Sequence, residues 1–175
     1  MKHNHFSVLR TVLCIVLLAA VYVLQTSLGL RISIFGAHID LLPPLLAAAG
    51  VVMGSGVGMV CGLAVGILYD ISGSGVDGVY PLYYMVWGIS CGFAGEGYRT
   101  RELRCTMACA MGMMAGIALL RYLFQLQFYG ADILLFGRSL LMQVALAAVF
   151  SPVALWIVRR IVGRKRRPNT VLRSK

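Results

Sequence analysis

The feature that most restricts how this chain can fold is a set of long runs without any charged residue. There are five such runs, 11–30, 41–69, 78–95, 105–120 and 139–158. A helix rises about 1.5 Å per residue and the hydrocarbon core of a bilayer is about 30 Å thick, so roughly 20 apolar residues cross it. Three runs therefore fit one span each, and 105–120 does so if its helix continues through Phe124.

Composition supports the same class of protein. Only 13% of the 175 residues are charged, 59% are hydrophobic, and the mean hydropathy is +0.84. A soluble domain keeps about a quarter of its residues charged, so a soluble globular enzyme is excluded. Disorder is excluded too, because it requires low hydrophobicity. We expect an all-α integral membrane protein.

The run 41–69 decides how many times the chain crosses the membrane. As one helix its 29 residues would be about 43 Å long, too long without strong tilt. The chain would then have five spans, and its basic C-terminal tail would lie outside. That arrangement violates the rule that cytoplasmic segments carry the excess of lysine and arginine.

A helical hairpin over 41–69 gives six segments and restores the charge rule. Pro43-Pro44 suits a helix start, and Gly54-Ser55-Gly56 supplies a turn near the middle of the run. Thirteen basic residues then lie inside, including Arg99, Arg101, Arg104 and the eight that follow Val158, against three outside, Arg31, Arg121 and Arg138. We therefore predict a six-segment transmembrane helical bundle with both termini cytoplasmic. Its second and third segments are short, and one of them need not cross fully.

This organisation divides the chain into three parts. Residues 1–10 form a cytoplasmic N-terminal tail, 11–160 a single six-helix transmembrane domain, and 161–175 a basic cytoplasmic tail. The tail attracts anionic lipid, because each juxtamembrane lysine or arginine contributes about 1 kcal/mol near such a surface. Membrane topology and attraction to anionic lipid account for the positive charge of the tail, so we expect no nucleic-acid partner. The N-terminal run 11–30 lacks a cleavage site of small residues, which favours an uncleaved first span.

Small residues recur every four positions in two stretches, the run 41–69 and the predicted fifth segment. One series is Gly50, Gly54, Gly58, Gly62 and Gly66, and the other is Ala108, Gly112 and Gly116. This spacing places the glycines on one helix face, where another backbone can approach closely. The face serves either packing within this chain or docking of another membrane protein, and the sequence leaves both open.

Charged residues near the outer ends of the helices are candidates for structural roles. Asp70 ends one predicted helix, Asp77 can cap the next, and the loop between them is either a capped connector or a structural motif. Arg121 lies close to the hydrocarbon, where a charge costs at least about 3 kcal/mol. We expect it to snorkel outward or to pair with Asp132 or Asp70, in preference to forming a transport site.

Groups that would support catalysis are missing from the sequence. It contains no H-E-x-x-H, P-loop or G-x-S-x-G motif. The five cysteines behave as small hydrophobic residues, and Cys105 and Cys109 have no histidine or acidic cluster to complete a metal site. We therefore expect no catalytic residues, cofactor or metal, and an intramembrane enzyme is the least favoured hypothesis.

The region from Asp40 to Gly95 resembles the bacterial rod shape-determining protein MreD family. Asp40-Leu41-Leu42-Pro43 is similar to the family's start of the second segment, with proline and aspartate in a different order. Residues 58–73 resemble a glycine-rich helix ending in G-x-x-x-D-x-x-S/G-G, with one residue fewer between Asp70 and Ser72-Gly73, and Gly78 follows. Chain length, six segments and a basic tail also agree.

The resemblance implies a non-catalytic scaffold in the bacterial inner membrane. It implies binding to an MreC-like single-span protein beside the actin-like MreB, the RodA glycosyltransferase and a class B penicillin-binding protein. That elongation machinery inserts peptidoglycan and maintains rod cell shape. The implied fold is similar to the substrate-binding subunit of energy-coupling-factor transporters, and structural roles are implied for Asp70, Gly73 and Gly78.

That fold similarity makes a vitamin-type substrate-capture subunit the alternative function. Such subunits carry an A-x-x-x-A motif in the first segment, but here Ala19 and Ala20 are followed four residues later by Val23 and Leu24. A vitamin site also needs several convergent polar side chains. The candidates are few, namely Gln25, Gln125, Gln127 and Arg121.

Overall fold

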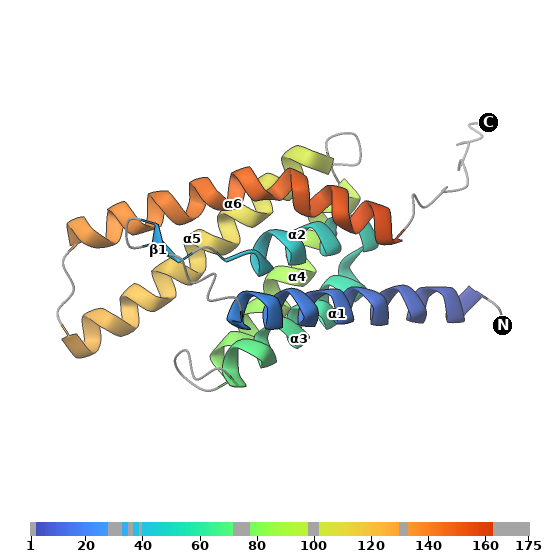
Figure 1. The fold of residues 1–175 in the computed structure, drawn as a ribbon, viewed down its shortest axis with the longest axis horizontal. Helices are drawn as coiled ribbons and strands as arrows, with labels where there is room; N and C mark the ends of the chain where they lie inside the picture. The colour runs from blue at the N-terminus through green and yellow to red at the C-terminus, as the bar shows by residue number, and fades with distance from the viewer. Residues whose placement is uncertain are drawn as a thin grey trace, which may run out of the picture.

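The computed structural model describes an all-helical protein with a very short β ladder. Residues 3–27, 33–34, 37–38, 40–71, 78–97, 102–129 and 133–162 are described. Within them lie six helices and two strands (Figure 1): α1 (His3–Ser27), β1 (Ser33–Ile34), β2 (Ala37–His38), α2 (Leu42–Met53), α3 (Ser55–Ile71), α4 (Val79–Gly97), α5 (Glu102–Tyr129) and α6 (Ile133–Val162). The strands pair antiparallel, with Ser33 opposite His38 and Ile34 opposite Ala37.

Helix α2 is the centre of the bundle. It contacts all five other helices, and every residue from Leu42 to Val51 is buried. A helix start buried among apolar side chains normally leaves backbone N–H groups without acceptors. No side chain caps this one, but Pro43 and Pro44 occupy the first turn. Because proline has no N–H group, the buried helix start carries two fewer donors to satisfy.

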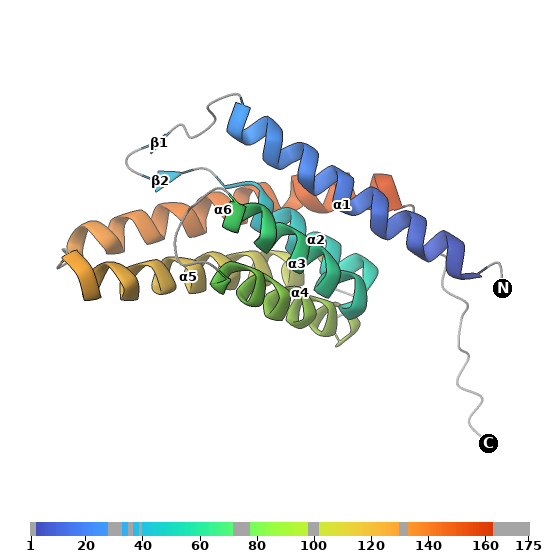
Figure 2. The same cartoon turned by 90° about the horizontal axis from the view of Figure 1, so that it is seen from below.

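A single glycine separates α2 from α3 and reverses the chain. Gly54 adopts φ +99°, a conformation that L side chains rarely adopt, and its N–H donates to the Gly50 carbonyl at 2.9 Å. Figure 2 shows α2 and α3 running in opposite directions side by side. The hairpin expected over 41–69 is therefore present. Its turn is at Gly54 alone, because Ser55 and Gly56 already belong to α3.

The reversal determines where the chain begins and ends in space. Helix α1 begins and α6 ends at the same end of the bundle, on the right in Figures 1 and 2. An unbroken helix over 41–69 would place them at opposite ends. Helix α1 already begins at His3, inside the segment 1–10 predicted as a tail, because no glycine or proline interrupts residues 3–27.

Among the described helices, three are long and apolar enough to cross a membrane. Their candidate spans are Leu9–Ser27, Glu102–Leu120 and Leu140–Ile161. Helices α2 and α3 are also apolar but have only 12 and 17 residues, about 18 and 26 Å. Large hydrophobic side chains are exposed on α1, α3, α4, α5 and α6. An outer surface of this kind fits an integral membrane protein, whose solvent is lipid.

Helices α5 and α6 are longer than expected and form an antiparallel pair. Both figures show this pair extending well beyond the ends of α3 and α4. The sequence predicted a fifth segment reaching Phe124, whereas α5 runs from Glu102 to Tyr129. The physical reason is continuity of helix-forming residues, since neither glycine nor proline occurs between Gly116 and Gly130.

Candidate functional site

The glycines of α3 bring its backbone against the backbone of α4. A Cβ atom placed on Gly58 would lie 2.3 Å from the Gly88 carbonyl oxygen, and one on Gly62 would lie 2.2 Å from the Tyr84 carbonyl oxygen. On Gly66 it would lie 2.3 Å from the Pro81 Cα. Backbone atoms cannot move aside as a side-chain end can. Of the two uses that the sequence left open for this glycine face, the structure shows packing within the chain.

Two aromatic side chains of α4 pack against the glycines of α5. A Cβ atom on Gly112 would meet the Trp87 ring at 2.9 Å, and one on Gly116 would meet the Tyr83 hydroxyl at 2.3 Å. That hydroxyl donates to the Met113 carbonyl oxygen at 2.6 Å. Helices α4 and α5 are thus joined by two rings of α4 that fit where α5 lacks side chains.

Asp70 connects the end of α3 to the start of α4. The N–H of Gly78, which lies at φ +85° immediately before α4, donates to Asp70 Oδ2 at 2.8 Å. A carboxylate at a helix N-terminus is also favoured by the helix dipole. The sequence predicted Asp77 for the cap, but Asp77 and Gly73 lie outside the described residues.

A polar cluster that sequence reasoning missed lies between α1, α2 and α3. Asp40, two residues before α2, accepts a hydrogen bond from the Tyr69 hydroxyl at 2.5 Å and one from Gln25 Nε2 at 3.0 Å, both at Oδ1. The sequence contains a signal for this contact. Asp40 is 14 residues before Gly54 and Tyr69 is 15 residues after it, so a hairpin with its turn at Gly54 brings the two together.

Tyrosine rings extend this cluster into the bundle. The Tyr69 ring stacks on those of Tyr84 and Tyr80, with centroids 5.2 and 6.0 Å apart, and meets Tyr22 edge-on at 6.2 Å. Tyr84 is fully buried. The space between α1, α3 and α4 at this level is therefore filled by the chain's own aromatic side chains.

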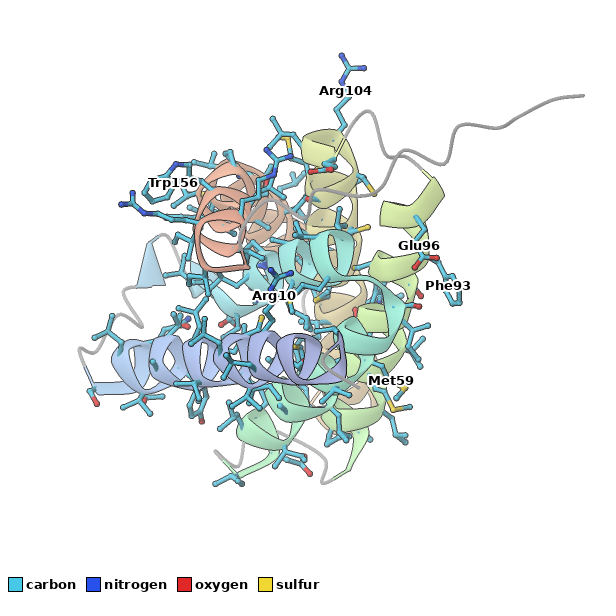
Figure 3. The ribbon with its side chains drawn as sticks, turned by 90° about the vertical axis from the view of Figure 1, so that its right-hand side faces the viewer. Arg10, Met59, Phe93, Glu96, Arg104 and Trp156 are labelled. Atoms are coloured by element: carbon cyan, nitrogen blue, oxygen red, sulfur yellow. The ribbon has the colours of Figure 1, made fainter. Side chains whose placement is uncertain are left out.

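The opposite end of the bundle carries the described basic side chains. Figure 3 looks at this end, with Arg10 on α1, Glu96 on α4, Arg104 on α5 and Trp156 on α6. Arg159 on α6 forms an ion pair with Glu102 on α5, which joins the two helices at their ends.

Other predicted site residues are placed only in part. Arg121 lies within α5, but its side chain is outside the described part of the structure, and so is all of Asp132. The structure therefore does not test the predicted pair. The five cysteines are unbridged thiols. Among the described residues, no group of three histidine, cysteine or acidic side chains is arranged to hold a metal ion.

Comparison with protein-family models, with curated proteins and with solved structures found no match. The resemblance to MreD therefore depends on the motifs quoted above.

Proposed function

We propose that the chain is a non-catalytic scaffold of the MreD type in the bacterial inner membrane. It would cross as a six-segment bundle with both termini in the cytoplasm, and support peptidoglycan insertion and rod shape through its partners. One observation carries the proposal. Within the family-like stretch 58–73, Gly58, Gly62 and Gly66 pack against the α4 backbone, and Asp70 accepts a hydrogen bond at the start of α4. A motif used in this way suits a protein that acts by binding.

The partner we propose is an MreC-like single-span protein, through which the chain would join MreB, RodA and a class B penicillin-binding protein. Because the glycine faces are occupied inside the bundle, the partner would contact exposed apolar side chains. Candidate positions are Val16 on α1, Val86 on α4 and Leu141 on α6, which are 58, 56 and 71% exposed.

Photo-crosslinking tests this partnership at single positions. A photoreactive residue at Val16, Val86 or Leu141 should crosslink to the MreC-like protein in cells expressing both at native level, at one of these positions at least. A photoreactive residue at Ala49, which is 0% exposed, is the matched control and should give no product. Recovery of the chain alone, monodisperse and without the partner, would contradict the proposal.

A ligand screen distinguishes the scaffold from the alternative function, a vitamin-capture subunit. Thermal-shift measurements against vitamins should show no stabilisation if the chain is a scaffold. A submicromolar ligand would favour the transporter subunit.

A further inference from the structure

One face of α6 combines an apolar stripe with a cation at its end. Val149, Val153, Trp156 and Arg160 follow at spacings of four, three and four residues, which places them on one side of a helix. Val149, Val153 and Trp156 are 67, 51 and 60% exposed. Figure 3 shows Trp156 pointing outward from α6, away from the bundle.

The cation is held over the aromatic ring at the end of this stripe. The Arg160 guanidinium carbon lies 5.3 Å from the centroid of the Trp156 ring, within the range of a cation–π interaction. The neighbouring Arg159 is already paired with Glu102. Among the described side chains, no carboxylate forms an ion pair with Arg160, so its charge faces outward.

The surrounding charge favours an anionic occupant. The described side chains at this end include Arg10, Arg104, Arg159 and Arg160 against Glu96 and Glu102. Trp156 lies five residues before the end of the candidate span at Ile161. This is the level at which tryptophan and arginine meet lipid headgroups.

We propose that this face binds an anionic phospholipid. The phosphate would accept hydrogen bonds from the Arg160 guanidinium, which the Trp156 ring holds in place. One acyl chain would lie along Trp156, Val153 and Val149. The site is separate from the basic tail, and it does not depend on the scaffold function proposed above.

The chain contains two tryptophans, and this makes the site directly measurable. In the variant W87F, Trp156 is the only tryptophan, and its fluorescence is quenched by bromine atoms on neighbouring acyl chains. The protein is placed in phosphatidylcholine vesicles with phosphatidylglycerol, and either lipid is brominated at the same mole fraction. We expect brominated phosphatidylglycerol to be enriched about fivefold at Trp156, the factor that one arginine near an anionic surface contributes.

Three variants made in W87F separate this site from general attraction to the positive end. R160Q should abolish the preference for phosphatidylglycerol, whereas R104Q and a chain ending at Gly163 should retain most of it. Equal quenching by both lipids, a preference that survives R160Q, or one that disappears with the tail would overturn the proposal. If W87F does not fold, the difference in quenching between the unaltered chain and W156F gives the same quantity.

Discussion

At the scale of single residues, Ser151 and Pro152 show how α6 keeps its backbone groups satisfied inside the bundle. Pro152 has no N–H, so the carbonyl oxygen of Ala148, four residues earlier, loses its helical donor. The Ser151 hydroxyl donates to that oxygen at 2.8 Å, and Ser151 is fully buried. Inside a membrane no water molecule is available to donate a hydrogen bond to such a carbonyl.

The first prediction follows from this replacement of a backbone N–H donor by the Ser151 hydroxyl. S151A should lower the free energy of unfolding in detergent by about 1 kcal/mol, because the Ala148 carbonyl is left without a donor. The double variant S151A/P152A should lose less, since replacing the proline restores the missing backbone N–H. The matched control is S90A, because Ser90 makes a similar bond to the Val86 carbonyl at 2.9 Å, but at an exposed position without a following proline. An equal loss in S151A and S90A would contradict this account.

A second prediction concerns the hydroxyl that holds Asp40. Y69F keeps the ring stacking but removes the donor to Asp40, so we expect a loss of about 1.5–3 kcal/mol, the range for hydrogen bonds to charged groups. The measurement is unfolding in detergent, followed by the fluorescence of Trp87 in a W156F background. Q25A, measured alone and with Y69F, completes a double-mutant cycle. Strictly additive losses would mean that Gln25 and Tyr69 do not act on the same carboxylate.

At the scale of elements, the α3–α4 pair depends on backbone contact. We predict that G62A prevents normal packing and lowers stability by more than about 2 kcal/mol, because its Cβ would overlap the Tyr84 carbonyl group. G56A is the control. Apart from its chain neighbours and its own helix backbone, no heavy atom lies within 4 Å of a Cβ there, and alanine should stabilise α3 by about 0.5–1 kcal/mol. Size-exclusion profiles and melting temperatures in detergent compare the two, and equal profiles would refute the contact.

The same elements show what the sequence could and could not supply. The number of helices, the hairpin and its glycine turn were predictable, because the lengths of the charge-free runs and the positions of the basic residues between them are properties of the sequence itself. The contact of Asp40 with Tyr69 was not predicted, although the symmetry of the hairpin about Gly54 implies it. The groups that pack against Gly58 and Gly112 could not be assigned from the sequence. A glycine every fourth residue makes room equally for a neighbouring backbone, as at Gly58, and for an aromatic ring, as at Gly112.

At the scale of the whole molecule, the Gly54 reversal determines the end of the bundle at which each later loop lies. We predict that, in a variant without native cysteines, S72C is labelled by an impermeant maleimide in intact spheroplasts. T170C should be labelled only after the membrane is opened, because an even number of segments returns the tail to the cytoplasm. Labelling of T170C in intact spheroplasts would overturn the six-segment proposal.

The enclosure of α2 bears on how the protein is made. Helix α2 has only 12 residues, too few to cross the hydrocarbon core alone, so the insertion machinery cannot release it into the bilayer as an independent span. We infer that it stays beside the translocon until α3 and α4 emerge from the ribosome and close around it. Biogenesis would then be limited by the completion of this three-helix unit.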